Sequence, residues 1–427
     1  MPVLKSAVLA LEAQCRKAKE ASRRMAYLPT DVKNRALEYL AQDLITKKDE
    51  ILSANKVDLG KSKKEGLAGA LYERLRLNPA ILEGMAHDVM AVVALPDPVG
   101  EVFDMKTLPN GLIVGRKRVP LGVIATVYES RPNVTTDISA LSLKSGNAVI
   151  LRGGREALNS NRALAHLVQG ACAKAGVPQD AVQFIENTDH ALVDHLLRMN
   201  QYIDLIVPRG GTPLITFVRD NASIPVVAGG IGVNHTYVDK AADIEKAVRI
   251  IYNAKVQKPS VCNALDCVLC HKDVARKALP LIAKELAKGK VELHCDERSL
   301  AILKSNKSLK LLPATDKDWG KEYLDLIVAV KVVDSIDAAM SHMAKYGTGH
   351  SEAIVTEDYQ VALRFLNEVD AACVYVNAST RFTDGGQFGL GAEVGISTQK
   401  MHARGPMGLR EITSYKWLIL GSGQVRS

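Results

Sequence analysis

Cys262 is the residue of this chain whose surroundings best suit nucleophilic chemistry. It follows a turn at Pro259 and precedes Asn263 and Ala264, so we expect it in a loop. A thiol nucleophile must be exposed and partly activated, and a loop beside a polar Asn meets these conditions better than the middle of a strand. The alternative is that Cys262 is a small buried apolar residue, as most free cysteines are.

A glycine-rich stretch lies about 120 residues further along the chain. It runs from Arg381 to Gln399 and continues into the segment from His402 to Leu409. Together with the cysteine loop, this stretch suggests an enzyme that transfers an acyl group through a thiol.

Gly210 and Gly211 follow the apolar run from Ile203 to Val207, and a predicted helix opens at Thr212. Backbone amides and a helix N-terminus at the carboxyl edge of a parallel sheet suit a pyrophosphate group. A plain strand-to-helix turn is the alternative.

A second turn of this kind carries arginines. Arg152, Gly153, Gly154 and Arg155 follow the apolar run from Ala148 to Leu151. Guanidinium groups at that edge would lie where the adenosine ribose can carry a 2′-phosphate. The pattern therefore favours NADP over NAD, with surface cations as the alternative.

Arg131 and Asn133 follow a third apolar run, from Gly122 to Val127. An Asn at this position can donate to an oxyanion, and an Arg can bind phosphate or carboxylate. The alternative is that Pro132 and Asn133 only form a turn.

Cys267, Cys270 and His271 have the spacing of haem attachment or half of a zinc site. The run from Leu265 to Cys270 reads instead as a strand, which would place Cys267 and Cys270 on opposite faces. We therefore predict neither metal nor haem.

The composition favours a multidomain enzyme of the α/β class. The chain has 427 residues, a low aromatic content of 5% and abundant aliphatic residues. The net charge of +8 is spread along predicted helices, so a nucleic acid partner is not required. The seven cysteines are an odd number, no secretory segment is recognised, and no apolar run reaches the ~18 residues that cross a membrane. We expect a cytoplasmic protein with reduced thiols.

Helices and parallel strands must position these residues. The first 60 residues read as helical hairpins, with Leu37, Leu40, Leu44 and Ile45 at helical spacing and Thr30 or Asp31 as a cap. Short apolar runs separated by amphipathic stretches then predict a doubly wound sheet; they lie at 122–127, 148–151, 182–185 and 203–207.

Asn110 and Gly111 lie between two extended runs within 102–119 and predict a β-hairpin. Residues 412–420 could pair with it, forming either an oligomerisation flap or a surface ornament. A second lobe is expected from residue 253, with strands at 265–270, 326–333 and 353–355 and a helix at 274–288. The predicted fold is two doubly wound Rossmann-like domains with a small flap. The expected bounds are 1–100 and 122–252 for the NADP-binding domain, 253–400 for the cysteine domain, and 101–121 and 401–427 for the flap.

With these segments, the chain resembles the γ-glutamyl phosphate reductases, the proline-biosynthesis branch of the aldehyde dehydrogenase superfamily. The resemblance spans nearly the whole chain and rests on five motifs in the same order. They are Gly122 through Tyr128-Glu129-Ser130-Arg131-Pro132-Asn133-Val134-Thr135, Ser145 through Gly154, Pro208-Arg209-Gly210, Cys262-Asn263-Ala264, and Arg381 to Leu409.

The resemblance implies reduction of L-glutamate 5-phosphate by NADPH to glutamate 5-semialdehyde, with release of phosphate. It also implies that Cys262 attacks the acyl phosphate and that Asn133 and the Cys262 amide hold the oxyanion. Arg152, Gly153, Gly210, Gly211 and Thr212 would contact the cofactor. Glu322 would bind its ribose, with an exposed helix-end carboxylate as the alternative.

The candidates for substrate phosphate and carboxylates are Arg131, Arg381, His402 and Arg404. For His402 and Arg404 a structural role at a C-terminal interface is the alternative. The expected partners are the small-molecule substrate, other copies of the chain, and the glutamate 5-kinase that would supply the acyl phosphate.

One departure from the family concerns hydrolysis. Ala228 stands near where aldehyde dehydrogenases carry a carboxylate that activates water, so we expect slow thioester hydrolysis. His235 reads as a core residue rather than a base. The competing interpretations are an ordinary aldehyde dehydrogenase and a catalytically silent scaffold for the kinase; retention of Cys262 and of the glycine motifs argues against the scaffold.

Overall fold

The computed structural model describes residues 2–67, 69–227, 229 and 231–426. The chain forms two compact units: unit 1 consists of Met1–Gly229, Gly389–Gly395 and Met407–Ser427, and unit 2 of Gly230–Phe388 and Ile396–Pro406. The predicted boundary at residue 253 is therefore corrected to residue 230. The reason is that the strand Asn234–Val238 pairs with two strands of unit 2.

Unit 1 opens with helices, as predicted. They are α1 (Pro2–Met25), α2 (Thr30–Thr46), α3 (Lys48–Lys64), α4 (Gly69–Leu75) and α5 (Pro79–Ala94). Leu37, Leu40 and Leu44 are buried, whereas Ile45 is 40% exposed. The predicted cap is wrong: α2 begins after Pro29 without a side-chain cap, and the Thr30 hydroxyl donates to Asp97.

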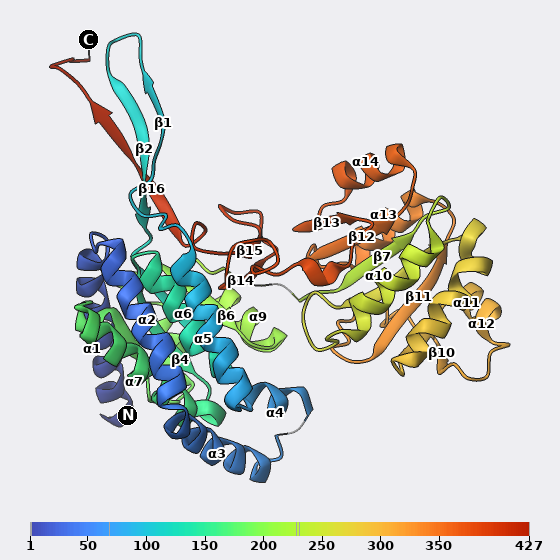
Figure 1. Cartoon of the computed structure of the whole chain (residues 1–427), viewed down its shortest axis with the longest axis horizontal. Helices are drawn as coiled ribbons and strands as arrows, with labels where there is room; N and C mark the ends of the chain where they lie inside the picture. The colour runs from blue at the N-terminus through green and yellow to red at the C-terminus, as the bar shows by residue number, and fades with distance from the viewer. Residues whose placement is uncertain (1, 68, 228, 230, 427) are drawn as a thin grey trace. The chain divides into compact units, whose positions relative to one another are not determined.

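A parallel four-stranded sheet forms the centre of unit 1, in the order β5-β4-β3-β6. Its strands match the four predicted runs; they are β3 (Val123–Tyr128), β4 (Ala148–Gly153), β5 (Val182–Phe184) and β6 (Leu205–Arg209). Helices follow the strands, namely α6 (Asn133–Lys144), α7 (Leu158–Ala175), α8 (Ala191–Leu196) and α9 (Thr212–Asn221). Every residue of β3 and β4 is buried, because helices cover both faces of such a sheet. Figure 1 shows α2, α5, α6 and α7 side by side in this unit.

Unit 2 contains a parallel seven-stranded sheet in the order β10-β9-β11-β8-β7-β12-β13. The strands are β7 (Asn234–Val238), β8 (Leu265–His271), β9 (Glu292–Cys295), β10 (Leu311–Pro313), β11 (Ile327–Val333), β12 (Ser351–Val355) and β13 (Cys373–Val376). The helices are α10 (Ile244–Val256), α11 (Lys272–Lys288), α12 (Glu297–Leu303), α13 (Ile336–Tyr346) and α14 (Tyr359–Glu368). The short strands β14 (Gly395–Ser397) and β15 (Gly405–Met407) pair with each other.

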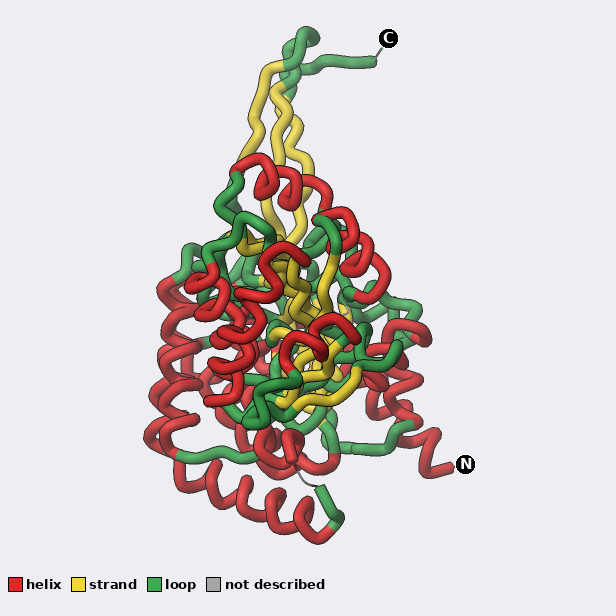
Figure 2. Tube along the Cα trace, turned by 90° about the vertical axis from the view of Figure 1, so that its right-hand side faces the viewer, coloured by secondary structure: helices red, strands yellow, loops and turns green. Residues whose placement is uncertain are grey.

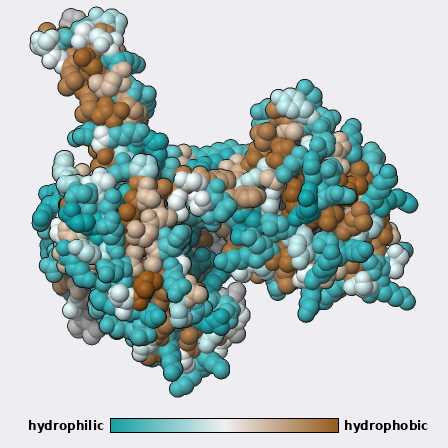
Figure 3. Space-filling model, viewed as in Figure 1, coloured by the Kyte–Doolittle hydropathy of each residue, from teal (hydrophilic) through white to brown (hydrophobic). Residues whose placement is uncertain are grey.

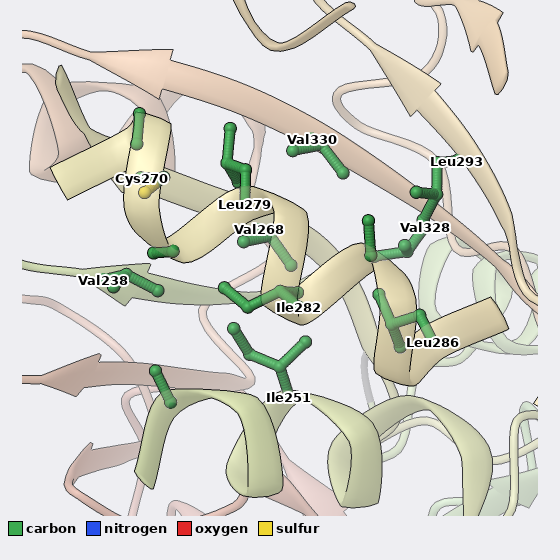
Figure 4. Close-up of a cluster of buried hydrophobic side chains, with 14 of the residues drawn as sticks. Val238, Ile251, Val268, Cys270, Leu279, Ile282, Leu286, Leu293, Val328 and Val330 are labelled. Carbon is green, nitrogen blue, oxygen red and sulfur yellow. The ribbon is translucent and has the colours of Figure 1, made fainter. Parts of the chain in front are cut away.

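The core of unit 2 has two halves, one on each face of the sheet. Figure 4 shows the first half, where Val268 and Cys270 of β8 lie against Leu279 and Ile282 of α11. Cys267 lies in the second half, with residues of α13 and α14. The alternation predicted for Cys267 and Cys270 is therefore confirmed.

The predicted hairpin is formed by β1 (Val102–Thr107) and β2 (Ile113–Pro120), and β16 (Thr413–Leu420) adds to β2 in antiparallel register. Gly111 has a φ of +83°, which its position in the tight turn requires. We call this three-stranded sheet the flap. Figures 1 and 2 show its strands extending away from the helices of unit 1, and Figure 3 shows apolar side chains gathered on it.

Among the described residues, no helix combines the length and the apolar composition that crossing a membrane requires.

Candidate active site

Cys262 is the most accessible thiol of the chain. All seven cysteines are described, and six of them are buried while Cys262 is half-buried. Burial raises the pKa of the Cys15, Cys172 and Cys270 thiols to about 12, so these stay protonated at neutral pH. Accessibility therefore singles out the cysteine that the sequence predicts as nucleophile.

Side-chain hydrogen bonds fix the backbone of the Cys262 loop, which follows α10. The amide nitrogen of Asn234 lies 2.7 Å from the carbonyl oxygens of both Cys262 and Ala264. The Thr380 hydroxyl donates to the Asn263 carbonyl at 2.8 Å. Three consecutive carbonyls thus accept hydrogen bonds from side chains of unit 2.

Arg381 lies beside this loop, in a short helical turn (η3, Thr380–Phe382). Its guanidinium donates to the Asn263 side-chain oxygen and, through Nε, to Gln257 Oε1 at 2.9 Å. Burial lowers the pKa of Arg381, and the nearby Asp384 and Cys262 oppose this effect. The structure therefore brings two predicted site residues, Cys262 and Arg381, close enough for electrostatic interaction.

Glu322 also lies in unit 2 and is half-buried. Its Oε1 accepts a hydrogen bond from the Gly232 backbone at 3.1 Å, and the neighbouring Tyr323 amide donates to Asp266. Burial raises the pKa of Asp266 to about 7. Glu322 is therefore held in an ordered loop, and it is not the exposed helix-end carboxylate considered as its alternative.

His402 and Arg404 lie in the segment that connects β14 to β15. His402 is exposed, and Arg404 donates to Asp370 at 2.7 Å. Lys400 and Arg404 together hold the pKa of Asp370 below its usual range. This ion pair is the contact expected of a structural role for Arg404, and the substrate-binding role of both residues stays a prediction.

Unit 1 contains a cavity of about 750 Å³ at the carboxyl ends of β3 and β4. Arg152, a predicted cofactor-binding residue, lines this cavity, and its Nη2 donates to the Thr188 carbonyl at 2.9 Å. Gly153, the last residue of β4, is absent from the lining, whereas Gly154 is present. Burial lowers the pKa of Arg152.

Three further residues of this cavity were not predicted from the sequence. They are Glu129, Ser130 and Glu156, and the Ser130 amide donates to the Glu156 carboxylate at 2.6 Å. Their common signal is position, because each follows the carboxyl end of a parallel strand.

The predicted glycine turn Gly210–Thr212 lies between β6 and α9. The Gly211 amide donates to Glu129 Oε2 at 3.1 Å, and α9 begins at the next residue. A side chain at Gly210 would overlap Leu214 and Glu129. Leu214 and Phe217 of α9 line the cavity, so the turn adjoins it.

Asn133 begins α6, and its amide donates to Asp137 at 2.8 Å. Burial raises the pKa of Asp137 to about 7. Arg131 precedes this helix and is half-buried. These two predicted residues belong to unit 1, as the cavity does.

His235, Cys267 and His342 form a buried cluster in unit 2 whose spacing would permit a metal ion. Other contacts occupy these groups: Glu352 binds His235 Nδ1, and Lys331 Nζ lies 3.3 Å from His342 Nδ1. An ammonium donating to Nδ1 leaves the proton of a neutral His342 on Nε2, which faces Cys267 at 3.9 Å. We therefore interpret the cluster as hydrogen-bonded core.

Ala228, on which the expectation of slow thioester hydrolysis rests, lies outside the described residues.

The sequence profile of the aldehyde dehydrogenase family matches residues 4–308. The chain therefore belongs to the aldehyde dehydrogenase family.

Within this family the chain is similar to proteins named gamma-glutamyl phosphate reductase. The protein of Dehalococcoides mccartyi is 58% identical over 423 residues, which cover 99% of this chain and 100% of the relative. That of Caldanaerobacter subterraneus is 53% identical, covering 97% of this chain and 99% of the relative. The crystal structure of gamma-glutamyl phosphate reductase from Thermotoga maritima has a TM-score of 0.93 at 48% identity and covers 98% of this chain and 100% of that chain. The predicted resemblance and fold class are confirmed.

Proposed function

We propose that this chain reduces L-glutamate 5-phosphate to L-glutamate 5-semialdehyde with NADPH and releases phosphate, which is the reductive step of proline biosynthesis. The observation that carries the proposal is the full-length similarity to enzymes named gamma-glutamyl phosphate reductase, at up to 59% identity. The half-buried Cys262 supplies the nucleophile that this chemistry needs.

The thiolate of Cys262 attacks the acyl carbon of the substrate. A C–S bond forms, the C–O bond to phosphate breaks, and the phosphate leaves with the electron pair. The nicotinamide cofactor, when bound, supplies the hydride that converts the thioester into the aldehyde. The thiolate leaves as the aldehyde forms, so Cys262 is regenerated.

Arg381 is the cation that we assign to the acyl phosphate, because its guanidinium interacts electrostatically with Cys262. We assign the oxyanion to the Asn133 amide and the Cys262 backbone amide. Arg131, His402 and Arg404 are the remaining candidates for the substrate carboxylates. These assignments rest on residue chemistry and family resemblance.

The cofactor of this family is a nicotinamide dinucleotide. We propose that the unit 1 cavity holds it: the N-terminus of α9 would face its pyrophosphate, and Arg152 and Arg155 would surround the adenosine ribose. Glu322 of unit 2 is the proposed partner of the second ribose. The two arginines support NADPH over NADH.

We further propose that the chain acts in the cytoplasm as a homo-oligomer joined through the flap. Free cysteines suit a reducing compartment. Val102, Trp417 and Ile419 of the flap are 49%, 55% and 58% exposed, and such a concentration of apolar surface is typical of an interface. Transient contact with a glutamate 5-kinase also stays a proposal.

The reverse reaction tests the function. NADP reduction is followed with glutamate 5-semialdehyde, with and without inorganic phosphate, in wild type, Cys262→Ala and Cys15→Ala. We expect turnover that requires phosphate and Cys262 and that persists in Cys15→Ala, because Cys15 is buried in α1. Phosphate-independent oxidation would indicate an ordinary aldehyde dehydrogenase instead, and no turnover in wild type would favour the scaffold.

A further inference from the structure

The segment Gly232–Asn234, which ends at the first residue of β7, contacts the Cys262 loop. Asn234 does so through its side chain and Gly232 through its backbone. Asn234 is fully buried, and its two amide hydrogens are donated to the Cys262 and Ala264 carbonyls, both at 2.7 Å. Its Oδ1 accepts from the Ser351 amide of β12 at 3.1 Å. One side chain thus joins the loop to two strands of the central sheet.

Gly232 independently indicates that this segment lies close to the backbone of the Cys262 loop. A Cβ at Gly232 would overlap the Cys262 carbonyl oxygen and would lie 3.1 Å from the Cys262 Cα. The obstacle is backbone rather than a flexible side chain, so no residue with a side chain fits unless the loop moves. Gly232 is therefore required for the position that the loop occupies.

The segment is itself held by groups outside the Cys262 loop. The Gly232 amide donates to Glu322 Oε1 at 3.1 Å, and the Val233 amide donates to the Thr348 hydroxyl at 3.1 Å. The Cys262 loop is therefore held by a segment that Glu322 and Thr348 hold in turn. Because each peptide is planar, fixing the Cys262 carbonyl also fixes the direction of the next amide and restricts the Cys262 backbone.

We propose that Asn234 is a positioning residue for Cys262: its amide, together with the bare backbone of Gly232, holds the Cys262 thiol in its reactive place. The inference rests on the proposed function for its catalytic consequence, since Cys262 is the proposed nucleophile. Loss of the two donors lets the loop leave its place beside Arg381. The reactivity of the thiol then falls, apart from any change in stability.

Asn147 offers a matched control in unit 1. It is also fully buried; its Nδ2 donates to the Ile412 carbonyl at 2.9 Å and to the Ser145 hydroxyl, and its Oδ1 accepts from the Gly122 amide. Asn→Asp therefore removes two buried donors at either site. Of these two asparagines, only Asn234 touches the Cys262 loop.

The experiment compares Asn234→Asp with Asn147→Asp. It measures kcat and KM, the melting temperature, and the rate of Cys262 alkylation by iodoacetamide against pH, followed by mass spectrometry of the Cys262 peptide. We expect Asn234→Asp to lower kcat at least tenfold and to move the alkylation profile to higher pH, since a carboxylate beside the loop and a greater distance from Arg381 both disfavour the thiolate. Asn147→Asp should keep the wild-type profile and kcat at a similar loss of melting temperature.

Asn234→Ser keeps one donor and should lie between wild type and Asn234→Asp in alkylation rate. The proposal is overturned if Asn234→Asp alkylates as wild type does and loses no more kcat than Asn147→Asp. Alkylation needs no substrate, so it decides the positioning role even if the wild type fails to reduce glutamate 5-phosphate.

A second pair of variants covers the case in which Asn234→Asp does not fold. Gly232→Ala is compared with Gly170→Ala in α7, where an added Cβ meets nothing within 4 Å. We expect slower Cys262 alkylation only in Gly232→Ala. Wild-type alkylation in folded Gly232→Ala would show that the loop does not depend on this contact.

Discussion

At the scale of single residues, we expect the reactivity of Cys262 to depend on the charge beside it. Arg381 is the proposed source of that charge, and its loss should raise the pKa of the thiol. We expect Arg381→Ala to lower kcat/KM about 10- to 100-fold, because a charge-assisted hydrogen bond contributes roughly 1.5–3 kcal/mol. The Cys262 alkylation profile should also move to higher pH. Steady-state kinetics and alkylation test this.

Arg364→Ala is the control for Arg381→Ala. Arg364 lies in α14 with a side chain that is 40% exposed, and it pairs with the exposed carboxylates of Asp337 and Glu368. Its removal should change neither kcat/KM nor the profile. Wild-type kinetics in Arg381→Ala would exclude the proposed role of this guanidinium.

A second residue-scale prediction concerns Asp137, whose pKa burial raises to about 7. The unfolded chain has a value near 3.9, so between about pH 4 and 7 the folded protein holds a proton that the unfolded chain has released. The free energy of unfolding therefore falls as the pH rises through this window. Asp137→Asn removes the dependence, and its melting temperature relative to wild type should increase from pH 5 to pH 8.

We expect the free energy of unfolding of Asp137→Asn, relative to wild type, to increase by about 1–3 kcal/mol between the two pH values. This figure is discounted because the Asp137 side chain is only partly buried. Thermal unfolding at the two pH values measures it. Asp31→Asn, at an exposed carboxylate of α2 paired with Arg35, should show no such difference. An equal shift in both variants would contradict the assignment to Asp137.

At the scale of elements, the turn after β4 should select the cofactor. Arg155 lines the cavity and its side chain is 73% exposed, so it can reach a 2′-phosphate. We expect Arg155→Ala to raise the KM for NADPH about tenfold and to leave that for NADH unchanged, since one guanidinium–phosphate contact contributes roughly 1.4 kcal/mol. Arg162→Ala in α7, whose guanidinium binds Glu186, is the control. Equal changes for both cofactors would argue against this selection.

The elements also explain what the sequence could predict. β3, β4 and β8 are mostly apolar and are buried on both faces, so their positions follow from the sequence. β7 begins Asn234-His235-Thr236, which are polar although buried, and so it gave no apolar signal. The boundary between the units was misplaced for this reason.

The candidate site shows the same limit. Cys262 and the glycine turns have local signatures, whereas Glu129, Ser130 and Glu156 meet only because β3 and β4 pair in register. The support of the Cys262 loop by Asn234 likewise depends on parallel pairing of β7 with β8. Contacts set by strand register between distant segments are not encoded in any single stretch of sequence.

At the scale of the whole molecule, the flap is a part of unit 1 that contributes to neither the cavity nor the Cys262 loop. Its strand β16 closes onto β2, and Arg116 stacks on Phe103 and Tyr415, each at 4.8 Å from the guanidinium carbon. This face is therefore ordered, yet Trp417 and Ile419 remain exposed. An ordered sheet whose apolar side chains stay this exposed is expected to pair with another copy.

We therefore expect Trp417→Asp combined with Ile419→Asp to convert the proposed oligomer to the monomer, because each carboxylate would lose its hydration in the interface. Light scattering after size-exclusion chromatography measures the mass. Leu9→Asp is the control, since Leu9 is 59% exposed on α1 and lies outside the flap. Cys262 alkylation should stay at the wild-type rate in the monomer, because the contacts proposed to position the thiol lie within unit 2 of one chain. An oligomer that survives both flap substitutions would place the interface elsewhere.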